Sequence, residues 1–286
     1  MYQCYCWKAF IRQDFLQYYR YTQKWVDLFD EEPYMVGIES AHYIKGMHNL
    51  MGSQFNLGNY QKLNATLKDF EKFCNSKIVL QNHNNLIQCF IYHTISQLNK
   101  HFLTGNFSDG LLLVEGIEEK LKEYEIYLDR HRILVIYYKI ASMYFGTGNY
   151  ETTIDYLNKI INWKVDLRND LQCYARLLHL IAHYELGNYQ LLEYLAKSVY
   201  RFMAKMQNLS VVEEEMFKFL RKALTLNARQ LKPEFEKLLN KLKKFENKRF
   251  ETRAFMYLDM ISWLESKINN VPVQKIIQGK YLSKKQ

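Results

Sequence analysis

Proline and glycine are scarce in this sequence, with 3 prolines and 11 glycines among 286 residues. β-Sandwiches and β-barrels need many turn residues, so this scarcity argues against both architectures. Long apolar runs are also lacking, since the stretch ILVIYY at 133–138 is far shorter than the roughly 18 residues of a membrane-spanning helix. The N-terminus has no basic start followed by an apolar block, so we expect no secretory signal and no membrane contact.

Motifs of common enzymes are lacking as well. We find no glycine-rich phosphate loop, no nucleophile elbow and no metalloprotease helix. His179 and His183 have a metal-compatible spacing, but no acidic residue lies between them as in zinc proteases, and both fall on packing positions. We therefore expect a non-enzymatic protein with no cofactor and no metal site, in which these histidines are structural.

Cysteine occurs as an odd, scattered set at positions 4, 6, 74, 89 and 173. Such a set does not resemble a disulfide framework, so a reducing compartment and a cytoplasmic location are expected. Aromatic residues make up 15% of the chain and hydrophobic residues 48%, which argues against disorder and for a sizeable buried core.

What the chain does contain is a sequence element written four times. A glycine, an asparagine and an aromatic residue follow one another at Gly58-Asn59-Tyr60, Gly105-Asn106-Phe107, Gly148-Asn149-Tyr150 and Gly187-Asn188-Tyr189. Spacings of 47, 43 and 39 residues between the glycines are typical of an array of supersecondary units. Glycine accepts the left-handed conformation that ends a helix, and asparagine is common in such turns. We predict that each element is the elbow of a helical hairpin, with the aromatic residue packing back on the first helix.

Apolar residues recur at helical spacing on both sides of each glycine. Eleven residues before it stand Met47, Thr94, Tyr137 and Arg176, and seven before it stand Met51, Leu98, Ala141 and Leu180. Nine and twelve residues after it stand Leu67, Val114, Leu157 and Ala196, then Phe70, Ile117, Ile160 and Val199. These positions are predicted to form the packing faces of the hairpins.

The pattern resembles the tetratricopeptide repeat family over roughly residues 40–205. The closest unit is YYKIASMYFGTGNYETTIDYLNKII, with Tyr137, Ile140, Ala141, Tyr144, Gly148, Tyr150 and Leu157 in matching places. The units are longer than the family's 34 residues, and its usual small residue five after the glycine is replaced by Leu63, Gly110, Thr153 and Leu192. The resemblance implies a divergent all-α fold, a right-handed superhelix of stacked hairpins that binds a protein or peptide.

The flanks also show helical patterns. The stretch 13–33 resembles the second helix of an earlier unit, with Phe15 in the aromatic position and Pro33 as terminator, which suggests that Met1 begins a fragment of a longer protein. Downstream, Ser210 and Glu213 predict a capping box, and Pro233 suits a first helical turn. We expect one helical-repeat domain over 1–268, with its best repeats over 33–208 and basic capping helices over 209–268, followed by a basic tail over 269–286.

The net charge of +9 lies in the last quarter of the chain. From Arg221 onward there are 16 Lys and Arg against 6 Asp and Glu. One predicted helix carries a basic stripe of Lys237, Lys241, Lys244 and Lys248. This stripe is compatible with an adaptor for nucleic acid or an acidic partner. A solvated face of the capping unit is favoured, because the stripe is lysine rather than arginine and has no exposed aromatic beside it, so a nucleic acid partner is not expected.

In the tetratricopeptide family the first helices line a concave surface. The corresponding positions here are His48, Phe55, Tyr92, Asn99, Phe102, Tyr138, Phe145, Tyr174, Leu177 and Tyr184. They are nearly uncharged, which is compatible with a peptide-binding groove or with packing between long helices. We expect a protein-binding scaffold that uses this aromatic groove. An enzyme hidden in the groove is a further alternative, and the tail could fill the groove of its own chain or of a second copy.

Overall fold

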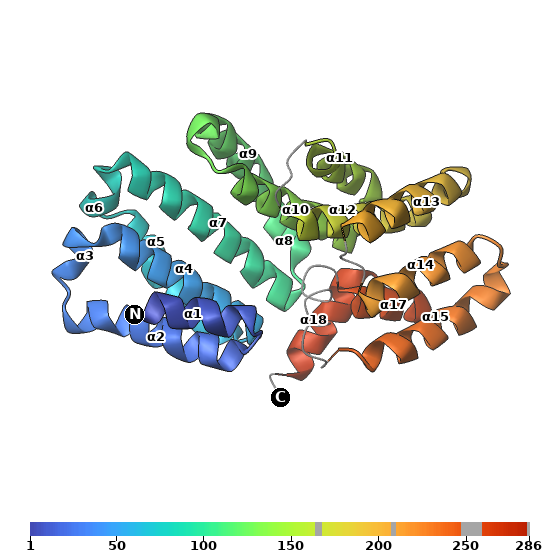
Figure 1. The fold of residues 1–286 in the computed structure, drawn as a ribbon, viewed down its shortest axis with the longest axis horizontal. Coiled ribbons are helices and arrows are strands. Elements are labelled where there is room, and N and C mark those ends of the chain that lie inside the picture. Colours follow the sequence, from blue (N-terminus) through green and yellow to red (C-terminus); the bar gives the residue numbers. More distant parts are fainter. Residues whose placement is uncertain (164–167, 207–209, 247–258, 285–286) are drawn as a thin grey trace. The chain divides into compact units, whose positions relative to one another are not determined.

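The computed structural model describes residues 1–163, 168–206, 210–246 and 259–284 (Figure 1). Over these ranges the chain is helical and contains no strand, so the predicted all-α class is confirmed. The helices form two compact units, which are described separately: unit 1 is Met1–Thr104 with Leu113–Asp129, and unit 2 is Gly105–Leu112 with Arg130–Gln286. None of the helices in the described ranges combines the length and apolar character needed to cross a membrane.

Unit 1 is a series of antiparallel hairpins. Its elements are α1 (Tyr2–Ile11), α2 (Phe15–Glu31), α3 (Met35–Ile38), α4 (Ser40–Asn56), α5 (Tyr60–Cys74), α6 (Lys77–Leu80), α7 (His83–Thr104), α9 (Val114–Glu123) and the 3₁₀ turn η1 (Glu125–Tyr127). Helix α2 packs between α1 and α4, and α4 and α5 both pack on α7. Each hairpin therefore buries its apolar faces against its neighbours, as in repeat proteins.

Unit 2 continues the same construction. Its elements are α8 (Phe107–Leu111), α10 (Arg130–Thr147), α11 (Tyr150–Ile161), α12 (Asn169–Glu185), α13 (Tyr189–Lys205), α14 (Val211–Ala223), α15 (Ala228–Lys243), α17 (Met260–Asn269) and α18 (Val273–Ser283). Helix α10 contacts α8, α11, α12 and α18, and α17 lies between α15 and α18 (Figure 1). The segment predicted as a tail thus contains a second C-terminal helix.

The four glycines do form elbows, as predicted. Their φ angles are 65° at Gly58, 66° at Gly105, 86° at Gly148 and 73° at Gly187. After α10 the N–H of Gly148 donates to the Phe145 carbonyl at 3.0 Å, and the N–H of Asn149 donates to the Tyr144 carbonyl at 2.9 Å. These two bonds form a Schellman motif, which satisfies carbonyls left free at a helix end.

The residues after the elbow glycine begin the next helix. The side chain of Asn149 accepts a hydrogen bond from the Thr152 N–H at 3.1 Å and so caps α11. The ring of Tyr150 packs against Phe145 with centroids 5.4 Å apart, and Tyr189 packs against Tyr184 at 6.1 Å. The prediction that the aromatic residue packs back on the first helix is confirmed at these two elbows.

A further elbow, missed from the sequence, joins α1 to α2. Gln13 has a φ of 53°, and the Gln13 and Asp14 N–H groups donate to the Phe10 and Ala9 carbonyls at 2.9 and 3.0 Å. Asp14 then caps α2 by accepting from the Gln17 N–H at 3.0 Å. This is the hydrogen-bond pattern of the glycine elbows with glutamine in the glycine position. The stretch before Pro33 is therefore the second helix of a hairpin, as predicted, but α1 supplies the first helix of that hairpin, which the sequence analysis did not predict.

The packing faces lie where the periodicity predicts them. All twelve residues seven before, nine after and twelve after an elbow glycine are buried: Met51, Leu98, Ala141, Leu180, Leu67, Val114, Leu157, Ala196, Phe70, Ile117, Ile160 and Val199. Four of them are among the most enclosed side chains of the described chain, namely Phe70, Met51, Leu98 and Leu157. Of the residues eleven before a glycine, Met47 and Thr94 are buried, whereas Tyr137 and Arg176 are only partly buried. The repeat therefore predicts most of the core of the hairpins.

In the C-terminal region the observed helix boundaries agree only in part with those predicted from the sequence. Ser210 and Glu213 form the predicted capping box at the start of α14. Pro233, predicted in a first turn, lies inside α15, because an unpredicted capping box between Asn227 and Gln230 starts that helix earlier. The predicted single domain over 1–268 stays a prediction.

Candidate interaction surfaces

Most residues of the predicted aromatic groove are core residues. Seven of the ten are buried: Tyr92, Asn99, Tyr138, Phe145, Tyr174, Leu177 and Tyr184. His48, Phe55 and Phe102 are partly buried. In unit 1 the His48 and Tyr92 rings stack with centroids 3.9 Å apart. The sequence allowed either an open peptide-binding groove or packing between helices at these positions. The seven buried residues pack between helices, so the expectation of an open groove surface is wrong for them.

The elbow explains why Phe145 and Tyr184 are not open anchors. A residue three positions before the glycine and the aromatic residue two after it lie on facing ends of the two helices. Phe145 and Tyr150 form an edge contact there, as do Tyr184 and Tyr189. Such pairs add to the energy of burial, so both rings stabilise their own hairpins.

The C-terminal end of α12, at Tyr184 and Glu185, is in contact with α17. Trp263 of α17 is 1% exposed, and its ring meets the edges of Phe235 at 5.8 Å, Phe219 at 6.4 Å and Tyr184 at 6.4 Å. These rings come from α12, α14 and α15 of unit 2. One predicted groove residue, Tyr184, thus contacts a docked helix of the same chain.

A carboxylate beside Tyr184 holds the same helix. Trp263 Nε1 donates to Glu185 Oε1 at 2.6 Å, and Lys267 Nζ donates to Glu185 Oε2 at 2.7 Å. The Glu185 side chain is only 5% exposed, so both oxygens are satisfied in a region sheltered from water. Burial and, to a smaller extent, the charge of Glu185 raise the pKa of Tyr150 on α11 to about 12.

Helix α18 lies against the elbow between α7 and α8. Gln278 Nε2 donates to the Gly105 carbonyl at 3.1 Å, and Ser108 Oγ donates to Gln274 Oε1 at 3.2 Å. A Cβ on Gly105 would lie 2.7 Å from the Gln274 carbonyl oxygen and the Gln278 nitrogen. The bare glycine therefore allows the backbone of α18 to approach closely.

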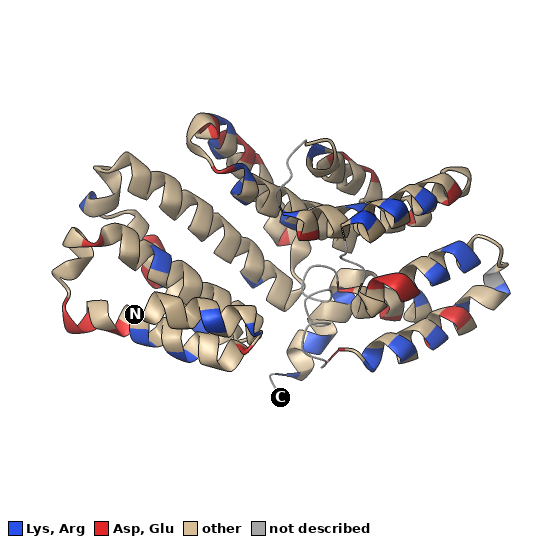
Figure 2. Cartoon of the chain, in the orientation of Figure 1, with Lys and Arg blue, Asp and Glu red and all other residues tan. Residues whose placement is uncertain are grey.

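Two of the four lysines of the predicted basic stripe form ion pairs, one between helices and one within α15. Lys241 pairs with Glu215 of α14 at 2.6 Å, and Lys237 pairs with Glu234 at 2.7 Å. Lys and Arg share α13, α14 and α15 with fewer Asp and Glu (Figure 2). Lys244 is exposed, and Lys248 lies outside the described residues. The paired lysines agree with a solvated, ion-paired capping face, which the sequence favoured over a binding surface.

Two histidines with metal-compatible spacing form a structural contact. The His179 and His183 rings pack edge to face at 4.5 Å, and Asn188 Nδ2 lies 3.0 Å from His183 Nδ1 at the next elbow. Burial, the neighbouring His183 and the charge of Arg176 lower the pKa of His179 to about 4. Among the described residues no group of three or more His, Cys, Asp or Glu could hold a metal ion, and the five cysteines are free thiols.

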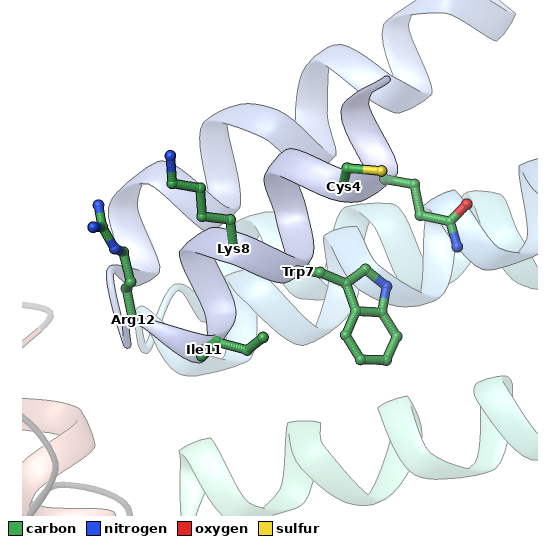
Figure 3. Close-up of a pocket in the computed structure, with 6 residues that line it drawn as sticks. Cys4, Trp7, Lys8, Ile11 and Arg12 are labelled. Carbon is green, nitrogen blue, oxygen red and sulfur yellow. The ribbon is translucent and has the colours of Figure 1, made fainter.

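Helix α1 carries an exposed apolar face that the sequence analysis missed. Trp7 is 58% exposed and Ile11 is 67% exposed, and an open pocket along this face is lined by Gln3, Cys4, Trp7, Lys8, Ile11 and Arg12 (Figure 3). The opposite face of α1 is buried, with Cys6 and Ala9 in a core cluster around Trp25. The available signal was that Trp7 and Ile11, four residues apart, do not lie on the same face as Cys6 and Ala9.

Comparison with known proteins gives no relative for this chain. No protein-family model, no curated protein and no solved structure matches it. What the chain binds is therefore inferred from the chemistry of its surfaces.

Proposed function

We propose that the chain is a non-enzymatic scaffold that binds helical segments of proteins. Its binding face is the end of the α12–α13 hairpin around Tyr184 and Glu185, together with the Gly105 elbow. The C-terminal helices α17 and α18 are the resident ligand of this face. An external partner would present a similar helix, with a tryptophan followed four residues later by a lysine on the same side.

The observation that carries this proposal is that Glu185 accepts two hydrogen bonds from the same helix, α17. Its two oxygens accept from Trp263 and Lys267, which follow it by 78 and 82 residues in the chain. Buried tryptophans and charge-assisted hydrogen bonds are the contacts that dominate binding energies at protein interfaces. The same contacts on a partner helix would give both affinity and orientation.

The proposal is tested by supplying α17 and α18 as a separate peptide to a chain whose own α17 is weakened. The binding protein is the full chain with Trp263→Phe and Lys267→Ala, which keep much of the packing volume but remove both donors to Glu185. The probe is a fluorescein-labelled synthetic peptide of residues 259–284. We expect saturable binding by fluorescence anisotropy, and weaker binding to the unmodified chain, because the tethered segment competes at a high effective concentration.

Two controls complete this experiment. A peptide with the same two substitutions should not bind, and adding Glu185→Ala to the binding protein should weaken binding of the native peptide. Far-UV circular dichroism establishes that each variant is folded. Failure of the native peptide to bind a folded double variant would mean that α17 is a permanent part of the core, and the proposal would be wrong.

Three broader expectations from the sequence belong to the same proposal. They are the right-handed superhelical stacking of the hairpins, membership of the tetratricopeptide family and a cytoplasmic location. The support for the first two is the repeated elbow, with its left-handed glycines and buried packing positions, and the location rests on the scattered cysteines of the sequence. The alternative of a nucleic-acid or acidic-partner adaptor has less support, since Lys237 and Lys241 pair with glutamates.

A further inference from the structure

The first helix has more apolar surface than its own unit covers. Its inner side packs on α2 within the cluster of Cys6, Ala9, Tyr18, Trp25 and Phe29. Its outer side exposes large apolar side chains, with Trp7 and Ile11 each more than half accessible to solvent. Large apolar side chains gathered on one exposed face usually mark a contact site. The outer face of α1 is therefore a surface that a binding partner would cover.

The side chains on this outer face are sorted by chemistry. Trp7 and Ile11 are one helical turn apart and point to one side of α1, whereas Lys8 and Arg12 form a second row beside them (Figure 3). Residues 1–12 contain no Asp or Glu. The next acidic residue, Asp14, caps α2. The face thus combines an apolar ridge with a purely cationic edge.

The cationic edge is not neutralised within the protein. Among the described residues, neither Lys8 nor Arg12 forms an ion pair, and both side chains are exposed. The lysines of unit 2 behave differently, because Lys218, Lys222 and Lys267 all pair with glutamates. A ligand for α1 is therefore expected to bring its own carboxylates to this edge.

We propose that the outer face of α1 docks an amphipathic helix of another protein, with a leucine-rich stripe against Trp7 and Ile11 and glutamates against Lys8 and Arg12. Helix α1 has ten residues and is about 15 Å long, so it matches about three turns of a partner helix. Tryptophan is enriched among the residues that dominate binding energy, and Trp7 occupies the middle of the face. This site lies in unit 1 and does not depend on the function proposed for unit 2.

Two other occupants fit the charges less well. A second copy of the chain would bring the same two cations into its own interface, with no acidic residue in residues 1–12 to neutralise them. An anionic lipid surface is attracted by clustered basic residues, but unit 1 as a whole contains 12 Lys and Arg against 14 Asp and Glu. An acidic helix needs only the local pair of cations.

Two matched peptides test the inference on the full chain. Both are 18-residue synthetic helices with leucine at heptad positions a and d, one with glutamate and the other with lysine at positions e and g. We expect the glutamate peptide to bind at least about tenfold more tightly by fluorescence anisotropy, because two ion pairs are gained and like charges are avoided. Replacing Lys8 and Arg12 by glutamate should reverse the preference.

Matched variants identify the face. Trp7→Ser should abolish binding, and Tyr194→Ser should leave it unchanged, since Tyr194 is an aromatic residue on α13 of unit 2 that is even more exposed, at 72%. Equal binding of the two peptides, binding of neither, or no effect of Trp7→Ser would overturn the proposal. It would also be overturned if Trp7→Ser abolished self-association in sedimentation, or abolished binding to phosphatidylserine vesicles while peptide binding was absent.

Discussion

At the scale of the residue, two glycines of this chain, Gly148 and Gly116, differ in backbone conformation. Gly148 ends α10 with a φ of 86°, and a Cβ placed on it would meet no atom within 4 Å. Gly116 lies inside α9 and would also accept a Cβ without contact, but no left-handed φ is found there. Backbone conformation alone therefore distinguishes the two positions.

This difference predicts stability changes of opposite sign. Gly148→Ala should lower the free energy of unfolding by about 1–2 kcal/mol, because an L-residue is strained in the left-handed region. Gly116→Ala should raise it by about 0.5–1 kcal/mol, because alanine favours a helix interior. Urea unfolding measures both. A change of the same sign in both variants would show that the elbow is not held in the left-handed conformation.

Single residues also set the limit of what the sequence could predict. The four elbows were predictable because glycine, asparagine and an aromatic residue together encode a helix end, a cap and a packing ring. The α1–α2 elbow was not, because Gln13 adopts a φ of 53° that glutamine does not normally favour. The surrounding hydrogen bonds of Asp14 impose that conformation, and they are visible only in the structure.

Carboxylates connect the C-terminal helices at the scale of the element. Glu215 of α14 accepts from Lys241 of α15 at 2.6 Å and from Lys218 at 2.9 Å. Glu265 of α17 likewise bridges Lys243 of α15 and Lys280 of α18. Hydrogen bonds from Lys241 and then Lys218 lower the pKa of Glu215 below its ordinary value of 4.5.

A lowered glutamate pKa makes these contacts sensitive to acid. The stabilisation is present above the unfolded-state pKa near 4.5 and is lost as the pH falls through the lower folded-state pKa. Glu215→Gln should therefore be less stable than the unmodified protein at about pH 6, and the difference should shrink as the pH falls below the ordinary glutamate pKa of 4.5. Urea unfolding at several pH values measures this. Glu236→Gln, an exposed position on α15, is the control, and a pH-independent difference for Glu215→Gln would contradict the assignment.

The buried residues of a helix could be predicted where the helix packs through a single apolar face. Met51, Leu98 and Leu157 are buried as expected, because the repeat places them between the helices of one hairpin. The first helices also bury a second face, so Tyr138 and Leu177 could not be identified as core residues from spacing alone. Their surroundings come from elements distant in sequence, as Trp263 does for Tyr184.

At the scale of the whole molecule, the chain passes between the two units more than once. Residues 105–112 belong to unit 2, whereas 113–129 return to unit 1. The helix expected after Gly105 is accordingly divided into α8 and α9. Within unit 2, α8 is held against α10 because the ring of Phe107 contacts Gly146, where a Cβ would collide with it.

Because contacts in hairpin arrays are mainly between neighbours, damage to one unit should stay local. Trp263→Ala removes a buried ring and should destabilise unit 2 by about 3–5 kcal/mol. Hydrogen exchange should then rise in α14, α15 and α17 but not in α2 and α4. Leu63→Ala in α5, also fully buried, should give the reverse pattern. An equal rise in both units for either variant would show that the chain unfolds as one cooperative body.

The backbone of α18 beside Gly105 gives that position a distinct mutational tolerance. Asparagine and aspartate accept left-handed angles, and Gly58 and Gly148 have open space around them. Substitution by asparagine or aspartate should therefore be tolerated at these two positions. At Gly105 any side chain would displace a helix that lies some 170 residues further along the chain, as the Gln278 contact shows. In a saturation library, position 105 would therefore tolerate fewer residues than positions 58 and 148, because a side chain there combines left-handed strain with displacement of α18.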